Sequence, residues 1–247
     1  MKKTRVGIVN YLNTKPLIYG LEREPISRQI DLIGDYPARL AARLMSDDID
    51  IGLVPVAVIP KLSSSFVIGD YCIGTEGEIA SVALFSEVPM HEIETVYLDY
   101  QSRTSAALLK YLMKDFWGIK PLVIESVNED YRNKIMGTTA GLVIGDRALE
   151  QRKVSTYIYD LGSEWRALTS LPFVFAAWIS KKEFSPEFVQ MFNQGNEMGL
   201  HHLDEITAGL NTDLYDMKKY YSLHLSYHLD TAKRKSMELF LDVIKEF

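Results

Sequence analysis

Short runs of β-forming residues alternate with helical patterns along the first 150 residues of this chain. Strands are predicted at residues 5–9, 29–33, 49–56 and 66–74, and a helix follows each of the first three. The pattern restarts after a long apolar run, with strands predicted at 94–99, 122–125 and 140–146 and helices at 101–118 and near 129–136. Strands that alternate with helices are typical of parallel sheets. The sequence therefore predicts an α/β protein.

Two longer apolar runs, at residues 79–86 and 171–180, suggest how the chain is divided. One interpretation is that both are strands passing between two lobes, with residues 1–82 and 176–247 in one lobe and 83–175 in the other. The helical remainder, 186–247, then packs on the first lobe. The alternative is a single sheet with both runs as central strands. A chain of 247 residues is long enough for either arrangement.

Composition excludes several classes of function. The formal charge is −6 and no stripe of Lys and Arg is present, which argues against a nucleic-acid partner. The longest basic cluster, "AKRK" at 232–235, is predicted to be the solvated face of a helix. The first apolar run is broken by Asn10 and Asn13, and no later run has membrane length. With Cys72 as the single cysteine, a buried thiol and a reducing, cytoplasmic location are expected.

One pattern resembles a metal site and is weighed against a structural role. His224 and His228 are four residues apart and are predicted to share a helix face. A zinc protease requires a Glu beside the first His, and Leu225 stands there instead. No metal site is predicted. Three tyrosines nearby are expected in a core or between helices: Tyr220, Tyr221 and Tyr227.

Small polar residues follow predicted strands in "NYLNTKP" and "DYQSRTS". The free N–H groups and positive dipole end of a helix start can bind an anion. Ser102, Thr104 and Ser105 add hydroxyl groups, and Arg103 either pairs with a carboxylate or points to solvent. For each turn alone, simple N-capping is the alternative. Two such turns in separate lobes would let a small anion bridge a cleft.

Six motifs occur in order: "NYLNTKPL", "DIGLVPV", "ASVALFS", "QSRTS", "VIGDRAL" and "DLGSEWRALTSLPFVFAAW". Together they resemble the chorismate dehydratases of the futalosine route to menaquinone, from the first strand to about Trp178. The C-terminal helices fit in length and character. One departure is Ser170, where the family pattern usually has Gly, and this raises a question about the backbone at that turn.

The resemblance implies a two-lobed, type 2 periplasmic-binding-protein-like fold, with each lobe a mainly parallel sheet flanked by helices and the ligand between them. It also implies a hydro-lyase reaction. Chorismate, a dicarboxylate, loses its ring hydroxyl and a ring hydrogen as water and gives 3-[(1-carboxyvinyl)oxy]benzoate. Aromatisation supplies the driving force, so neither a cofactor nor a metal is expected.

The same resemblance assigns candidate site residues. Asn13 is the candidate catalytic residue, holding either a substrate carboxylate or the departing hydroxyl through its amide. Asp146 orients a hydroxyl or backbone donor, or only caps the next helix. The full set of candidate substrate-binding residues is Ser81, Ser102, Arg103, Thr104, Ser105 and Asp146. No conventional general base stands out in the motifs. The base is either the substrate's own enolpyruvyl carboxylate or a side chain not yet identified.

Two other functions stay open on sequence alone. One is the 1,4-dihydroxy-6-naphthoate synthase of the same pathway, although that family opens with a different turn from "NYLNTKPL". The other is a solute-binding protein that delivers an anion to a transporter, since a fold does not fix a function. Apolar helix faces near the C-terminus could serve a core or a homodimer, so the oligomeric state also stays open.

Overall fold

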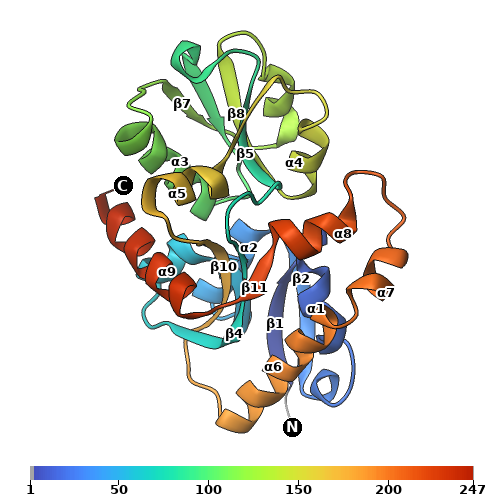
Figure 1. Ribbon diagram of the computed structural model, residues 1–247. Coiled ribbons are helices and arrows are strands. Elements are labelled where there is room, and N and C mark those ends of the chain that lie inside the picture. The colour runs from blue at the N-terminus through green and yellow to red at the C-terminus, as the bar shows by residue number, and fades with distance from the viewer. Residues whose placement is uncertain (1–2, 247) are drawn as a thin grey trace.

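Two β-sheets flanked by helices form the two lobes of a computed structural model that describes residues 3–246 (Figure 1). The first sheet, in the lower lobe of the figure, has the order β11-β4-β10-β3-β1-β2. Its strands are β1 (Thr4–Val9), β2 (Ile30–Asp35), β3 (Ile51–Pro55), β4 (Phe66–Thr75), β10 (Phe173–Ser180) and β11 (Ser226–His228). We call the lobe around this sheet lobe 1.

The second sheet lies in the upper lobe, lobe 2, and has the order β7-β6-β8-β5-β9. Its strands are β5 (Val82–Ser86), β6 (Thr95–Leu98), β7 (Leu122–Glu125), β8 (Thr139–Ile144) and β9 (Tyr157–Asp160). The two-lobed α/β architecture expected from the sequence is therefore present, and the single-sheet alternative is wrong.

Both sheets are mixed, rather than mainly parallel as predicted: the first has two parallel and three antiparallel pairings, and the second has two of each. β1 pairs in parallel with β2 and β3, and β6 pairs in parallel with β7 and β8. β10 runs antiparallel to β3 and β4, and β5 runs antiparallel to β8 and β9. A parallel neighbour requires a crossover connection. β5 and β10 are each the first strand that the chain forms after it crosses from the other lobe. They therefore do not follow a crossover within their own sheet, and they can pair antiparallel to their neighbours.

Nine α-helices cover the sheets within the described residues (Figure 1). They are α1 (Lys15–Leu21), α2 (Pro37–Met45), α3 (Thr104–Tyr111), α4 (Asp146–Gln151), α5 (Leu161–Thr169), α6 (Pro186–Leu200), α7 (Leu203–Ala208), α8 (Met217–Lys219) and α9 (Thr231–Val243). α1 packs on α6 beside the first sheet, and α5 lies between the lobes against β5, β9 and β10.

Three expectations for the C-terminal region are wrong in detail. Residues 186–247 are not wholly helical, because β11 adds an edge strand to the first sheet. His224 ends a π-helical turn (Tyr220–His224) and His228 lies in β11, so the two do not share a helix face. Lys233 of the "AKRK" cluster is fully buried, because its ammonium group pairs with Glu76 and Asp230.

The apolar run 79–86 contains β5 and the run 171–180 contains β10, and each strand pairs within one sheet. The chain passes between the sheets through residues 76–81 and again through 161–172, which include α5. The lobe limits proposed from the sequence, 1–82 with 176–247 and 83–175, remain a prediction about folding units.

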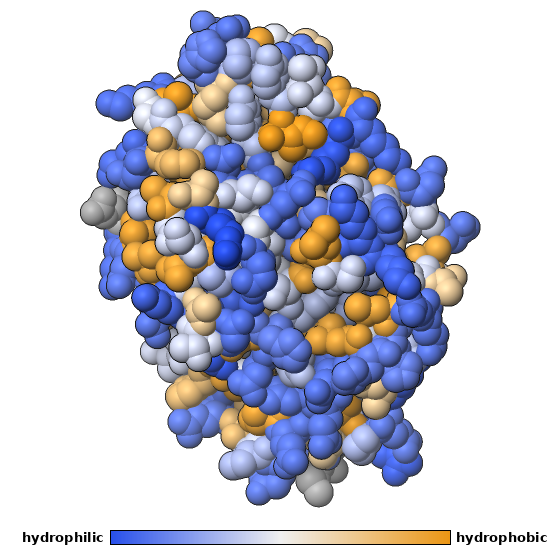
Figure 2. Space-filling model, in the orientation of Figure 1, coloured by the Kyte–Doolittle hydropathy of each residue, from blue (hydrophilic) through white to orange (hydrophobic). Residues whose placement is uncertain are grey.

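The strands supply most of the core, since every residue of β3, β5 and β10 is buried. Cys72 lies inside the first sheet as expected, and burial raises the pKa of its thiol to about 12. On the face shown in Figure 2, apolar residues reach the surface as separate patches among hydrophilic ones. No helix between residues 3 and 246 combines the length and apolar character needed to cross a bilayer.

Candidate active site between the lobes

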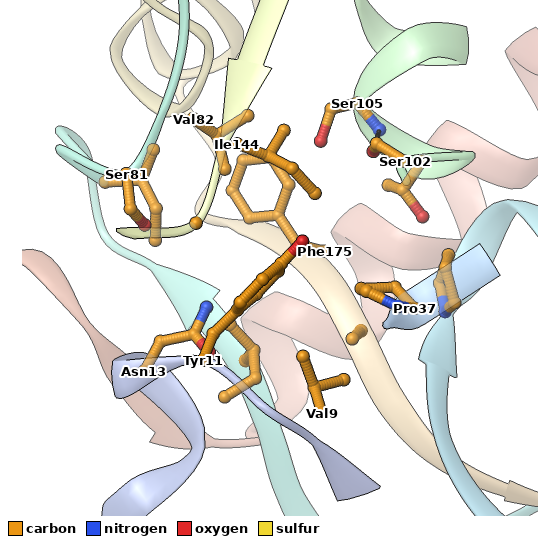
Figure 3. Close-up of a pocket in the computed structure, with 16 residues that line it drawn as sticks. Val9, Tyr11, Asn13, Pro37, Ser81, Val82, Ser102, Ser105, Ile144 and Phe175 are labelled. Atoms are coloured by element: carbon orange, nitrogen blue, oxygen red, sulfur yellow. Dashed lines mark hydrogen bonds between the residues drawn. The ribbon is translucent and has the colours of Figure 1, made fainter. Parts of the chain in front are cut away.

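A small cavity of about 50 Å³ lies where the two lobes meet (Figure 3). Its lining residues come from both lobes and from the first connection between them, residues 76–81: Val9, Tyr11, Asn13, Pro37, Pro55, Ile73, Ile79, Ser81, Val82, Ser102, Thr104, Ser105, Ile144, Gly145, Phe175 and Ala176. Five of the seven residues nominated from the sequence are therefore brought together. The carboxyl ends of β1 and β8 lead into this cavity, as expected for ligand sites in α/β folds.

The turn that carries Asn13 follows β1 directly and is fixed from three sides. Tyr221 donates its hydroxyl to the carbonyl of Leu12 at 2.9 Å, and Tyr227 donates to the carbonyl of Asn13 at 2.9 Å. From lobe 2, Asp146 accepts the N–H of Leu12 at 3.0 Å. Figure 3 shows the amide nitrogen of Asn13 turned toward the cavity. Asn13 thus presents its amide from a rigid turn.

The start of α3 contributes hydroxyl groups from the opposite wall. Ser102 Oγ, one residue before the N-cap Arg103, accepts the N–H of Ser105 in the first turn of α3 at 3.1 Å, and its own O–H remains available as a donor to a ligand. Thr104 Oγ1 accepts the N–H of Ala57 from lobe 1 at 3.2 Å. Arg103 is exposed and does not line the cavity. Of the two orientations considered from the sequence, the structure has the one toward solvent.

Ser81 lies on the connection between the sheets, directly after two residues that a buried carboxylate holds, and is itself bound by a buried tyrosine. Asp160 accepts the N–H groups of Ile79 at 3.0 Å and Ala80 at 2.8 Å. Ala80 has a φ of +64°, a conformation that costs free energy for a residue with a side chain. Tyr220 donates its hydroxyl to Ser81 Oγ at 2.7 Å. The carbonyl of Ser81 accepts the N–H of Gly145 at 2.8 Å, so Ser81 is bonded to both lobes.

Asp146 is placed beside the cavity rather than in its wall. It is the first residue of α4, and its two carboxylate oxygens lie 3.0 and 3.4 Å from the backbone nitrogen of Leu12. Burial raises its pKa above the usual value, although the hydrogen bond from Leu12 opposes this. Of the roles considered from the sequence, the structure favours orientation of a backbone donor.

Tyr11 was not singled out from the sequence, although it stands inside the "NYLN" motif. Its hydroxyl donates to Gln101 Oε1 across the cleft. Its ring lies against Gly145, whose φ is +67°, and a Cβ at that position would come within 2.8 Å of the ring. In Figure 3 the ring extends from the Asn13 turn into the space that the other lining residues surround. Tyr11 thus fills the middle of the closed cleft.

A buried ion pair between Asp99 and Arg147 was also missed. Arg147 Nη2 lies 2.8 and 3.0 Å from the two oxygens of Asp99. Asp99 further accepts the hydroxyl of Tyr131 at 2.9 Å and the N–H of Ile144 at 3.1 Å. The available signal was an Arg one residue after Asp146, at the end of a buried strand, where α/β ligands bind.

The cavity wall offers hydrogen bonds but no evident acid or base. Tyr11 is the one titratable residue among the lining residues, and burial raises its pKa, so it stays neutral. Lys15, which follows the Asn13 turn, is exposed and lies outside the lining. Within residues 3–246 no group of three or more His, Cys, Asp or Glu side chains could hold a metal ion. The site can position and polarise a ligand.

Comparison with known proteins places this geometry in a family. Residues 4–246 match a family described as menaquinone biosynthesis. The chain belongs to that family. Among its relatives is a chorismate dehydratase from Thermus thermophilus, which is 26% identical over 267 residues, covering 99% of this chain and 96% of that protein.

Solved structures support the fold at lower identity. A protein of Archaeoglobus fulgidus superimposes with a TM-score of 0.72 at 12% identity, covering 99% of this chain and 97% of that one. The periplasmic aliphatic sulphonate binding protein of Escherichia coli gives 0.67 at 12% identity, covering 100% and 87%. A Candida albicans protein with the generic periplasmic binding protein fold gives 0.65 at 12%, covering 100% and 91%. The fold predicted from the sequence, periplasmic-binding-protein-like, is confirmed.

Proposed function

We propose that this protein is a chorismate dehydratase, a hydro-lyase that converts chorismate into 3-[(1-carboxyvinyl)oxy]benzoate and water. Its family and its near full-length relative from Thermus thermophilus support this function. The observation that carries the mechanism is the interlobe cavity, whose wall has hydrogen-bonding groups at two helix starts and no carboxylate, His or Lys. A site of this kind suits a substrate that brings its own base.

Chorismate is a dianion, and the protein has a net charge of −6, so binding depends on local donors. The hydroxyl of Ser102 and the N-terminal end of α3 face the cavity from lobe 2, and the amide of Asn13 faces it from lobe 1. Apolar side chains such as Val9, Ile73 and Phe175 form the rest of the wall and suit a six-membered ring.

In the proposed elimination, the enolpyruvyl carboxylate of the substrate removes a proton from the ring. The electrons of the broken C–H bond form a ring double bond and the C–O bond to the hydroxyl breaks. The departing hydroxide takes up the proton and leaves as water, so the ring becomes aromatic without an oxidant. Asn13 holds the carboxylate or the departing hydroxyl, and such positioning supplies a large part of a barrier reduction.

The lobes must open before chorismate can enter. The cavity of about 50 Å³ is far below the roughly 300 Å³ at which small-molecule sites begin. Four hydrogen bonds join the lobes around it: Tyr11 to Gln101, Leu12 to Asp146, Ala38 to Gln101 and Ala57 to Thr104. Closure over bound substrate excludes water and favours internal proton transfer over exchange with solvent.

The test is ultraviolet spectroscopy of chorismate with the purified protein. The diene absorption of chorismate should be replaced by that of an aromatic product, and Asn13→Leu should fold normally but reduce kcat by about 10³-fold. Asn133→Leu, an exposed residue of lobe 2, is the matched control and should behave as wild type. An unchanged diene spectrum with folded wild-type protein would reject the dehydratase and favour a binding protein. Near-normal turnover by Asn13→Leu would make Asn13 only a turn residue.

We further propose a cytoplasmic location, in keeping with a biosynthetic enzyme, and no nucleic-acid or membrane partner. The possible homodimer is tested separately by light scattering. A mass near 28.1 kDa, the mass of one chain, would reject it, and twice that mass would support it.

A further inference from the structure

Among residues 3–246, Arg147 carries a buried nitrogen, Nη1, that has no hydrogen-bond partner. Its side chain is 12% exposed and that of Asp99 is 0% exposed. Nη2 binds both oxygens of Asp99, whereas Nη1 is buried without a hydrogen-bond partner. Leaving a buried donor unsatisfied costs about 1–3 kcal/mol, and more for a charged group. The structure bears this cost beside the cleft, which points to an acceptor from outside the chain.

The charge of Arg147 is also only partly used by Asp99. The Asp99 carboxylate accepts three further hydrogen bonds, from Tyr131 Oη, from the N–H of Ile144 and from the N–H of Gln101 at 3.0 Å. These donors stabilise the carboxylate independently of the guanidinium. The guanidinium can therefore take a second carboxylate on Nη1 while Asp99 keeps its other partners.

Arg147 lies directly behind the cavity wall. It follows Asp146, which binds the backbone of Leu12 from the other lobe. The Tyr11 hydroxyl is close enough to the guanidinium for its positive charge, and to a smaller extent a hydrogen bond with Arg147, to oppose the rise in the Tyr11 pKa that burial causes. Tyr11 lines the cavity and Arg147 does not. Tyr11 therefore lies between the cavity and the guanidinium group of Arg147.

We propose that Tyr11 moves aside when the cleft accepts its ligand, and that Nη1 of Arg147 then binds a carboxylate of that ligand. That the ligand is chorismate rests on the proposed function. That it is a small ring compound with a carboxylate does not depend on that function. The bound group is the ring carboxylate, because a cation on the enolpyruvyl carboxylate would weaken it as a base. Arg147 is thereby a substrate-binding residue that the sequence motifs did not assign.

Benzoate and its neutral analogue benzamide, compared by calorimetry, test this without any turnover. Wild-type protein should bind benzoate at least about tenfold more tightly than benzamide, as expected for one charge-assisted contact. The double variant Asp99→Asn/Arg147→Gln removes both charges of the buried pair at nearly constant volume, and its preference should fall below about threefold. Arg132→Gln is the charge-matched control, since Arg132 pairs with Glu150 away from the cavity, and it should keep the full preference.

Two outcomes would overturn the proposal: a tenfold preference retained by the double variant, or no preference in wild type. If the double variant fails to fold, Arg147→Lys keeps the charge but loses the planar fork, and it should lower the benzoate preference about threefold or more. With chorismate, the double variant should raise KM at least about tenfold and change kcat less. If wild type does not convert chorismate, the proposed function fails while the benzoate comparison still decides the role of Arg147.

Discussion

Two buried cations in this protein are held in different ways. Lys233 in α9 pairs with Glu76 and at 3.1 Å with Asp230, and these carboxylates are 58% and 51% exposed. Arg147 in α4 pairs with Asp99, whose side chain is fully buried, and one of its nitrogens has no hydrogen-bond partner within residues 3–246. Lys233 therefore has two carboxylates beside its single positive charge. Arg147 has one carboxylate, and its Nη1 can still donate to a further acceptor.

This difference in partners suggests that Lys233 has a structural role and that Arg147 binds a ligand. Glu76 lies on the connection between the sheets and Lys233 on α9, so their contact ties the C-terminal helix to the passage between the lobes. Arg147 makes its contact within lobe 2, one residue from the Asp146 bond to lobe 1. We expect changes at Lys233 to alter stability at constant ligand affinity, and changes at Arg147 to alter affinity.

The largest expected effect is at Asp99. Asp99→Ala leaves the Arg147 guanidinium buried without its carboxylate, and breaking a buried pair from one side costs about 3–5 kcal/mol. Urea unfolding should show a loss of this size in the free energy of unfolding. Asp115→Ala, an exposed acidic residue of the same lobe, should change it by less than about 0.5 kcal/mol.

A double-mutant cycle sharpens this prediction. The double variant Asp99→Asn/Arg147→Gln should lose less unfolding free energy than the sum of the losses in Asp99→Asn and in Arg147→Gln. In the double variant neither charge is left buried without its partner. Additive costs would mean that Asp99 and Arg147 do not act as a pair, and the contrast with Lys233 would then lose its basis.

The next effect in size is at Lys233. Lys233→Met keeps an apolar stem and removes the charge, while Glu76 and Asp230 can return to solvent, so the cost should be about 2 kcal/mol. Benzoate affinity should not change. Lys235→Met removes the same charge from an exposed position of α9 and should leave stability within about 0.5 kcal/mol. A loss of benzoate affinity in Lys233→Met would remove the distinction between the two cations.

The sequence supported the alternation of strands and helices, because hydrophobic periodicity is a local property. It could not supply the pairing directions of β5 and β10, since a fully buried strand has the same apolar appearance in either direction. The three residues of β11 carry too short a pattern to be recognised. Lys233 looked solvated because its partner Glu76 lies 157 positions away in the chain.

The candidate site was predictable where its residues sit in the turns themselves. Asn13 lies in the turn after β1, and Ser102 and Ser105 lie in the segment after β6. All three line the cavity. The role proposed for Arg147 depends on its ion pair with Asp99, 48 residues earlier, and on its proximity to Tyr11 across the cleft, so only the tertiary structure reveals it. Three tyrosine hydroxyls that hold the site turns also could not be recognised, because their partners are distant in the chain and leucines surround them in the sequence. They belong to Tyr220, Tyr221 and Tyr227.

A smaller effect on stability is expected at Ser170, which lies between Arg147 and Lys233 in the sequence. Ser170 ends α5 with φ +62° and ψ +11°, the left-handed conformation that Gly adopts at low cost. Ser170→Gly should raise the free energy of unfolding by about 0.5–1 kcal/mol, after the extra chain entropy of glycine is counted. Thermal melting should rise by roughly 1–3 °C, with benzoate affinity unchanged. A lower melting temperature would show that the serine side chain contributes more than its backbone strain costs.

The smallest expected effect is the acid dependence of the Lys233 cluster. Burial alone would raise the pKa of Asp230, but hydrogen bonds from the backbone N–H and the ammonium of Lys233 lower it below the usual 3.8. A carboxylate with a lowered pKa stabilises the folded state above about pH 4, and that contribution is lost as the pH falls below 3.8. Because Asp230 is half exposed, its share should be about 0.5 kcal/mol. Unfolding free energies compared at pH 5 and pH 3 should show this loss in wild type and in Lys235→Met, and a smaller one in Lys233→Met. An equal loss in all three proteins would mean that Lys233 does not stabilise the ionised form of Asp230, and that its burial serves packing alone.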